Sequence, residues 1–174
     1  STGGRPSWVT VDSAGNAIVV GSIVRATGLN PFGRIVLKYD AAGNLLWQEV
    51  IQRLGTGTDR VLTDAANNVY VLGNGLSELD NITMKYAPDG TRLWQRTGNG
   101  PVSFPSAMAL TRSNQLLIAG NILLRGTVAA YDPAGSLIWS KSTAASTVSD
   151  IAVGPSGEIV VAGGDYTNVG VDAF

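Results

Sequence analysis

The chain has 174 residues, of which 44% are hydrophobic and 14% are charged, and its formal net charge is −1. It contains neither Cys nor His, which excludes disulfides, Cys- or His-ligated zinc and Ser-His-Asp or Cys-His catalysis. The Lys and Arg residues are scattered and no apolar stretch reaches the ~20 residues that span a bilayer, so we expect neither nucleic-acid binding nor a membrane span.

The first 52 residues predict four short strands. The second of them, 17–20, is a continuous apolar run, which is typical of a strand buried on both faces. The turn from Asp12 to Gly15 precedes this strand, and Gly15 is a residue that tolerates the left-handed backbone of a hairpin turn. The predicted strands are 8–11, 17–20, 35–39 and 45–50.

The same elements recur along the rest of the chain. The closing glycines Gly21, Gly73, Gly120 and Gly163 lie 52, 47 and 43 residues apart. Only Gly and Asn occupy the left-handed turn slot, at Gly15, Asn67, Asn114 and Gly157. A Tyr, a Gly and a Trp recur three times at fixed separations. The three sets are Tyr39–Gly43–Trp47, Tyr86–Gly90–Trp94 and Tyr131–Gly135–Trp139. The later strands are predicted at 61–63, 69–72, 82–86 and 93–96, at 107–110, 116–119, 127–131 and 137–141, and at 151–153 and 159–162.

A repeat of this length with four strands predicts an all-β fold, a β-propeller or partial propeller of about four blades. The approximate units are 1–52, 53–99, 100–143 and 144–174, and essentially no helix is expected. Phe174 aligns with the start of a third strand, so we expect the last blade to be incomplete. A closed four-bladed ring, an arc of a larger ring and a ring closed by association all remain open.

The pattern Val11-Asp12-x-x-Gly15-Asn16, followed by Lys38-Tyr39-Asp40-x-x-Gly43-x-Leu45-x-Trp47, resembles the bacterial β-propeller repeat called the SBBP repeat. The Asp172-Ala173-Phe174 tail is similar to the opening of that family's third strand. The Tyr-to-Trp segment also resembles the outer strand of quinoprotein-type propellers, where the Trp docks between blades. The resemblance implies a propeller in a secreted or surface bacterial protein, and it assigns no activity.

The repeated residues are predicted to be structural. Asp12, Asp40 and Asp132 begin short turns in which an Asp side chain bonds its own backbone. Calcium is the alternative, but it needs six to eight oxygen ligands and each turn has one carboxylate. The three repeated tryptophans are expected to pack between blades, with a sugar-stacking array as the alternative.

Loop residues that do not repeat are the better functional candidates, because a residue that the fold requires should recur in every unit. By this criterion Trp8, Asp59, Arg60 and Asp150 are the predicted ligand-binding residues at the mouth of the propeller funnel. The longest loop, 25–34, is a second candidate contact surface. No catalytic residue, metal site or cofactor is predicted.

The function expected is that of a non-catalytic binding or scaffolding module of a secreted or cell-surface bacterial protein, with a protein or carbohydrate partner. An enzyme is the alternative, a lyase or a cofactor-dependent oxidoreductase with its site in the funnel. Clustering of Asp59, Arg60 and Asp150 would favour it. A third hypothesis is self-association through the open edges of the incomplete fourth blade.

Overall fold

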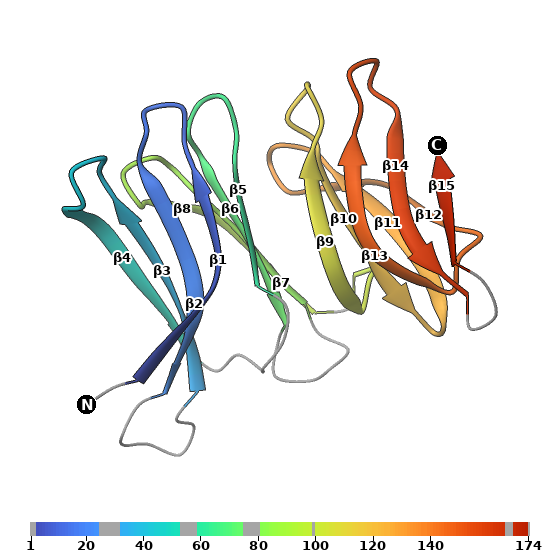
Figure 1. Ribbon diagram of the computed structural model, residues 1–174, viewed down its shortest axis with the longest axis horizontal. Coiled ribbons are helices and arrows are strands. Elements are labelled where there is room, and N and C mark those ends of the chain that lie inside the picture. The colour runs from blue at the N-terminus through green and yellow to red at the C-terminus, as the bar shows by residue number, and fades with distance from the viewer. Residues whose placement is uncertain are drawn as a thin grey trace. The chain divides into compact units, whose positions relative to one another are not determined.

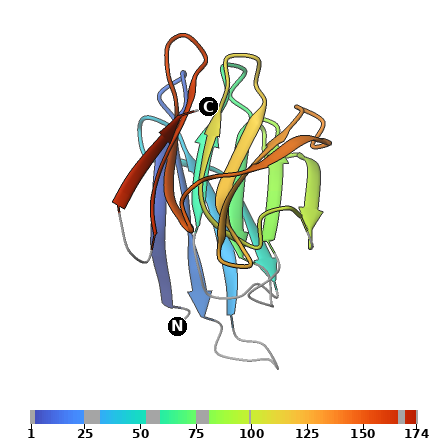
Figure 2. The ribbon, with the colours of Figure 1, turned by 90° about the vertical axis from the view of Figure 1, so that its right-hand side faces the viewer.

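The computed structural model describes residues 3–24, 32–52, 59–74, 81–98, 100–165 and 169–173. Within these ranges the chain consists of strands and turns without a helix, as the sequence predicts. None of these residues belongs to a helix that is long and apolar enough to cross a membrane. The strands form four sheets in which each strand pairs with its neighbours along the chain (Figures 1 and 2).

The first two sheets have four strands each, in chain order. They lie, apart from the ends of β7 and β8, in one compact unit formed by residues 1–78 and 82–96. The first sheet contains β1 (Gly3–Val11), β2 (Ala17–Val24), β3 (Phe32–Tyr39) and β4 (Leu45–Gln52). The second contains β5 (Arg60–Thr63), β6 (Val69–Asn74), β7 (Asn81–Tyr86) and β8 (Arg92–Thr97).

The third and fourth sheets lie in a second compact unit, formed by residues 79–81 and 97–174. The third sheet contains β9 (Phe104–Leu110), β10 (Leu116–Ile122), β11 (Arg125–Tyr131) and β12 (Leu137–Ser142). The fourth contains three strands within the described ranges, β13 (Thr147–Val153), β14 (Ile159–Gly164) and β15 (Val169–Ala173).

The turn between the first two strands of every sheet has the predicted left-handed residue. The φ angles are 81° at Gly15, 62° at Asn67, 58° at Asn114 and 92° at Gly157. In the first of these turns the Gly15 N–H donates to the carbonyl of Asp12 at 3.0 Å. A three-residue hairpin loop needs a left-handed residue at this point, and Asn tolerates that conformation better than other side chains do.

The Asp turns are closed by their own side chains, as predicted. One carboxylate oxygen of Asp12 accepts the N–H groups of Ala14 and Asn16, at 3.0 and 2.9 Å. The Asp40 carboxylate makes the equivalent bonds to Ala42 and Asn44. These oxygens satisfy the backbone of the turn, which is the structural role that a short Asp-x-x-Gly loop favours.

Apolar side chains from facing strands make the core of the first unit. Ile18, Val20 and Val36 of the first sheet are buried against Val61, Val69, Val71, Ile82, Met84 and Tyr86 of the second. Each fully buried large apolar side chain contributes about 1.5–3 kcal/mol relative to its exposed state. This core holds the two sheets face to face.

Trp47 packs between the two sheets of the first unit, as predicted. Its indole N–H donates to the carbonyl of Pro88 at 3.0 Å, and its ring centroid lies 5.7 Å from that of Tyr86. A Cβ at Gly90 would lie 2.8 Å from Cγ of Trp47, so this glycine leaves room for the ring. The glycines of all three repeated turns have a positive φ, of 85° at Gly43, 90° at Gly90 and 85° at Gly135, which accounts for their recurrence, and at Gly90 the absence of a side chain also accommodates Trp47.

The other two repeated tryptophans also pack against protein. Trp139 lies against the core of the second unit, which includes Leu117, Val128, Ile151 and Val161. The Trp94 ring makes an edge contact with Tyr70, with 6.1 Å between centroids. All three rings are half-buried, so packing describes them better than a sugar-stacking array does.

The prediction that every second strand is buried on both faces holds for two sheets and is wrong for the others. Residues 69–73 of β6 and 116–120 of β10 are buried throughout. In β2, by contrast, Ile18 and Val20 are buried while Ala17 and Val19 are half-exposed, and β14 is buried only at Val161. The apolar run shows that both faces of the strand carry side chains that could be buried. Whether they are buried depends on whether another sheet covers each face.

Candidate functional site

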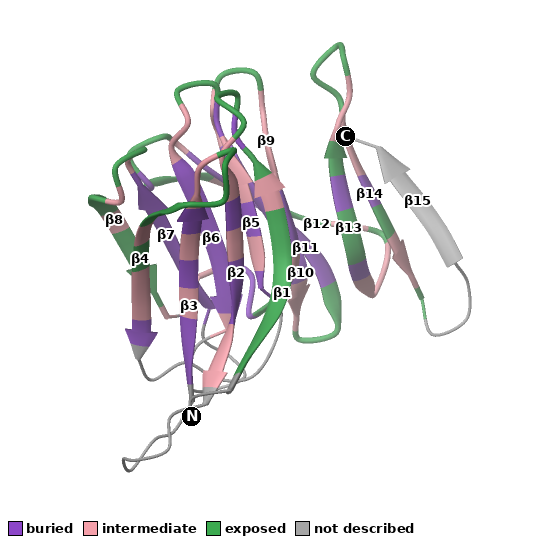
Figure 3. Ribbon diagram, turned by 60° about the vertical axis from the view of Figure 1, so that its left-hand side comes forward, coloured by how far each residue is buried: buried purple, intermediate pink, exposed green. Residues whose placement is uncertain are grey.

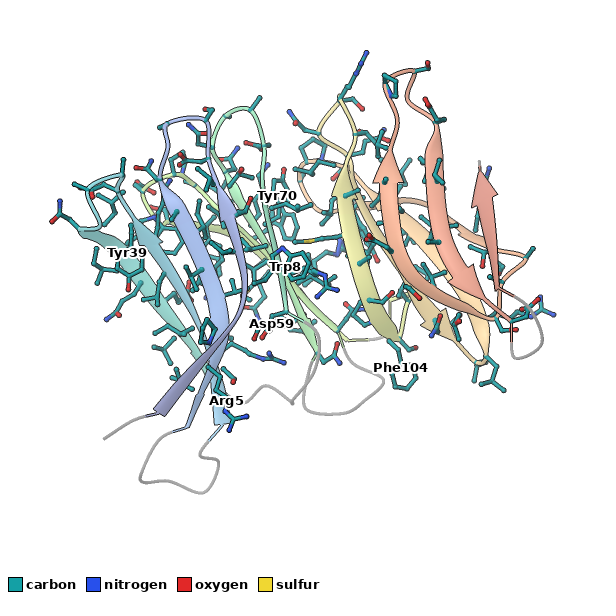
Figure 4. The ribbon with its side chains drawn as sticks, viewed as in Figure 1. Arg5, Trp8, Tyr39, Asp59, Tyr70 and Phe104 are labelled. Carbon is teal, nitrogen blue, oxygen red and sulfur yellow. The ribbon has the colours of Figure 1, made fainter. Side chains whose placement is uncertain are left out.

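Three of the four predicted site residues come together in the first unit. Trp8 lies on β1, Asp59 directly precedes β5, and Arg60 is the first residue of β5. The guanidinium carbon of Arg60 lies 4.1 Å from the centroid of the Trp8 ring, within the range of a cation–π contact. Trp8 remains 43% exposed and lies close to Asp59 (Figure 4).

Asp59 is the buried member of this cluster and contacts several of its neighbours. Its side chain is buried and forms an ion pair with the equally buried Arg34 of β3. The Ser7 hydroxyl donates to the same carboxylate at 2.9 Å, and Arg60 Nη1 donates to the backbone carbonyl of Asp59 at 3.1 Å. The contacts tie β1, β3 and the start of β5 together.

A β-bulge directs the Ser7 hydroxyl toward Asp59. The pairing register of β1 with β2 shifts between Pro6 and Trp8, which leaves Ser7 as the extra residue. Bulges bend a strand and re-aim a side chain in this way. The same shift occurs at Ser106 of β9 and Ser149 of β13, so the bulge is a feature of the repeat, and the bond to Asp59 is what the first sheet adds to it.

The Asp59 carboxyl is a fixed structural anion rather than a free base. Burial raises its pKa above the ordinary value, while the charge of Arg34 and the hydrogen bond from Ser7 oppose this shift. The carboxylate is inaccessible and already accepts two side-chain donors. What the cluster offers to a partner is the ring of Trp8 with the Arg60 guanidinium beside it.

Asp150 belongs to the second unit, whereas Trp8, Asp59 and Arg60 belong to the first. It lies on β13 in the second unit, is exposed, and accepts the N–H of Ile151 at 2.9 Å. Of the predicted contact loop 25–34, residues 25–31 lie outside the described residues. Its last residue, Arg34, is the partner of Asp59.

Sequence reasoning missed Arg34 as a member of the cluster, although a signal was present. Arg34 precedes the third strand's first buried apolar residues, and Asn81 and Gly126 occupy the equivalent positions of the next two units. It is therefore as non-repeating as Asp59. The criterion that selected Asp59 also selects Arg34, which the sequence analysis named only as the last residue of the candidate loop 25–34.

Two further buried carboxylates, Asp12 and Asp64, each pair with a lysine, although Asp12 was expected to serve its turn alone. Asp12 Oδ2 lies 2.9 Å from Lys38 Nζ in the first sheet, and Asp64 Oδ2 lies 3.8 Å from Lys85 Nζ in the second. In the third repeat, which forms the third sheet, the corresponding residues are both neutral, Thr111 and Ala130. Charge is thus present or absent at both positions together, as a buried pair requires.

Across the described ranges, no three residues of the types His, Cys, Asp and Glu gather closely enough to hold a metal ion. The three buried carboxylates of the first unit, Asp12, Asp59 and Asp64, are instead paired with Lys38, Arg34 and Lys85. The cluster around Trp8 therefore has the chemistry of a contact surface, with one aromatic ring and one cation.

Comparison with known proteins defines the fold class. No protein-family pattern and no curated protein sequence matches the chain. Among solved structures, it is similar to a luciferin-regenerating enzyme, with a TM-score of 0.60 and 14% identity over 98% of this chain and 60% of that one. The WD40 β-propeller domain of Doa1 gives 0.57 and 14% over 95% of this chain and 62% of that one.

A third similar structure is the β-propeller domain of the Trilobed protease from Pyrococcus furiosus. Its TM-score is 0.61, at 8% identity, over 91% of this chain and 48% of that one. The chain is therefore an all-β protein of β-propeller fold, with its strands arranged in four blade-like sheets. It spans about 60% or less of the length of the first and third of these similar chains.

Proposed function

We propose that this chain is a non-catalytic binding module, made of SBBP-type propeller repeats, in a secreted or cell-surface bacterial protein. The observation that carries the proposal is the half-exposed Trp8 ring, held in place by the Arg60 guanidinium 4.1 Å away. Trp and Arg are the residues that most often dominate binding energy at protein interfaces.

The cluster is pre-organised for binding. The bulge at Ser7, the buried Arg34–Asp59 pair and the Arg60 bond to the Asp59 carbonyl hold β1 and β5 in register beneath the ring. A side chain that is already ordered loses less conformational entropy when a partner covers it. A protein segment with an acidic residue beside an apolar one fits this surface, since it can pair with Arg60 and pack on Trp8.

The engagement of Asp59 supports binding over catalysis. A general acid or base must reach the proton that it transfers, and Asp59 is buried and bonded to Arg34 and Ser7. Two of the similar structures carry the names of enzymes, the luciferin-regenerating enzyme and the propeller domain of the Trilobed protease. The test therefore includes turnover as well as binding.

The experiment compares the wild-type chain with Trp8→Ala and Arg60→Ala on peptide and glycan arrays. Val9→Ala is the matched control, because Val9 neighbours Trp8 on β1 and is 59% exposed but points to the opposite face of the sheet. We expect peptides that bind the wild type at least tenfold more tightly than Trp8→Ala, with Val9→Ala unchanged.

Three results would count against the proposal. One is that neither array yields a ligand, and another is that every ligand binds Trp8→Ala as tightly as wild type. The third is hydrolysis or oxidation of a substrate panel by the wild type that is lost in Asp59→Asn. This last result would favour the enzyme alternative, since it needs a carboxylate that is active despite its ion pair.

A further inference from the structure

The first sheet carries an apolar face on the side that does not meet the second sheet. We name this the outer face and define it by Val9, Val11, Val19, Ile35 and Leu37. The pairing register places Val9 opposite Val19 and Val19 opposite Leu37, so these side chains share one side of the sheet. Val9 and Val11 are 59% and 60% exposed, and the other three are half-exposed.

A hollow of about 250 Å³ lies on this face. It is lined by Pro6, Val19, Gly21, Ile35 and Leu37 among others, and its walls are almost wholly apolar. Gly21 contributes to it because the strand beside it leaves no room for a side chain, since a Cβ there would lie 2.3 Å from the carbonyl oxygen of Arg5. The outer face is therefore shaped as well as apolar.

The repeat shows what such a face accommodates. Positions in the repeats can be matched by counting from the closing glycine and from the repeated tyrosine. By this count Val19, Ile35 and Leu37 correspond to Val71, Ile82 and Met84 of the second sheet. Those three residues are buried against the first sheet, in the core of the first unit. Figure 3 shows the contrast, with β1 largely exposed and β6 and β7 almost wholly buried. The outer face thus has the sequence of a face that receives another sheet.

The fourth sheet carries the complementary face. Ala152, Val160 and Ala162 occupy the positions that Thr10, Ile18 and Val20 occupy in the first sheet. Ile18 and Val20 are buried against the second sheet, whereas Ala152 and Ala162 are exposed. We name the side defined by Ala152, Val160 and Ala162 the donor face. The register places the exposed Asp150 on the same side, opposite Ala162. One chain therefore presents both sides of the sheet-on-sheet interface that its own first unit contains.

We propose that a second copy of this chain docks its donor face on the outer face, so that copies associate head to tail. Because the two surfaces are different, the contact is heterologous, and repeated association of chains gives either a closed ring or an open-ended filament. The outer face is an apolar patch, with Val9 and Val11 59% and 60% exposed, and such patches mark interaction sites. The inference does not rest on the cluster around Trp8, because that ring lies on the opposite side of the first sheet.

The test measures molar mass by light scattering from micromolar to hundreds of micromolar protein. The wild type is expected to exceed the 18.0 kDa of one chain as concentration rises. Leu37→Glu and Val11→Glu on the outer face, and Ala162→Arg on the donor face, are each expected to remain at the mass of one chain. Leu93→Glu is the matched control, because Leu93 is similarly exposed, on β8, and should associate as the wild type does.

Mixing variants tests the head-to-tail geometry. Val11→Glu retains a working donor face and Ala162→Arg retains a working outer face, so an equimolar mixture should form a complex of two chains that grows no further. Circular dichroism of each variant confirms that its strands are intact, and Val11 is exposed enough for its replacement to leave the core untouched.

The proposal is overturned if the wild type remains at one-chain mass at every concentration. It is equally overturned if Ala162→Arg associates as strongly as the wild type, because the contact would then join two outer faces. Association of both Val11→Glu and Ala162→Arg would also overturn it, and would indicate pairing through strand edges instead.

Discussion

The buried pair of Asp12 and Lys38 gives the most quantitative test of how the first sheet is stabilised. Their charged atoms lie 2.9 Å apart, and the two side chains are 0% and 2% exposed. At this distance of 2.9 Å and an effective dielectric constant of about 20, the attraction is about 6 kcal/mol. Desolvation costs several kcal/mol per ion and offsets most of that attraction.

Removing one charge leaves the desolvation of the other uncompensated. We expect Asp12→Thr and Lys38→Met each to lower the free energy of unfolding by about 3–5 kcal/mol. The double variant should lose less than about 2 kcal/mol, because it buries no charge. The third repeat already has this neutral arrangement. There Thr111 Oγ1 accepts the N–H of Gln115 at 3.0 Å, just as the Asp12 carboxylate accepts the N–H of Asn16 at 2.9 Å.

Urea denaturation of the four proteins measures these differences as shifts in the midpoint at constant m-value. Asp40→Thr is the control, because the Asp40 carboxylate makes the same turn bonds at the surface and its loss should have a much smaller effect. The reasoning is refuted if the two single losses add up in the double variant, since additivity means that the two groups do not interact.

The same variants should differ in acid. Burial by itself raises the pKa of Asp12, but hydrogen bonds from Asn16 and Lys38 outweigh it and hold that pKa below its ordinary value of 3.8. A carboxyl with a lowered pKa stabilises the fold above its unfolded-state pKa and loses this contribution as pH falls through the folded-state pKa. The wild type should therefore lose stability below about pH 4 more steeply than the double variant, and parallel curves would contradict this.

Two backbone substitutions have opposite expected effects. Leu124→Gly should raise the free energy of unfolding by about 1 kcal/mol, because Leu124 has φ of 63° and is 70% exposed, and thermal unfolding should show the midpoint rise by about 2–4 °C. A midpoint that falls would show that the leucine side chain contributes more than its strained backbone costs. Gly90→Ala should destabilise by at least about 1 kcal/mol more than Gly43→Ala, since both have positive φ but only at Gly90 would a Cβ meet Trp47, at 2.8 Å. Equal losses in urea denaturation would place the effect in the turn conformation alone.

Part of the candidate site was predictable because it depends on comparison between repeats. Trp8, Asp59 and Arg60 were selected as non-repeating residues, and the first unit brings them together. Arg34 was placed only at the end of the candidate loop 25–34, and its pairing with Asp59, 25 residues further along the chain, was not foreseen. The criterion selects residues that do not repeat, but it does not show which of them come into contact when the sheets pack.

The sequence by itself determined all the described strands except β15, their order within each sheet and the hairpin turns. These features depend on residues that are close together in the chain. Examples are the left-handed Asn67 and Asn114, and the turn in which the Asp12 side chain bonds the backbone of its own turn, so the sequence alone is enough to predict them. The alignment of Phe174 with the start of a third strand was wrong, because β15 already spans Val169–Ala173 and Ala173 lies opposite Val160 as Lys38 lies opposite Ile18. Only the tertiary structure decided which apolar strand faces are covered and which buried carboxylate meets which cation. Val19 and Val71 occupy the same repeat position, yet one is half-exposed and the other buried, because burial is a property of the neighbouring sheet rather than of the strand.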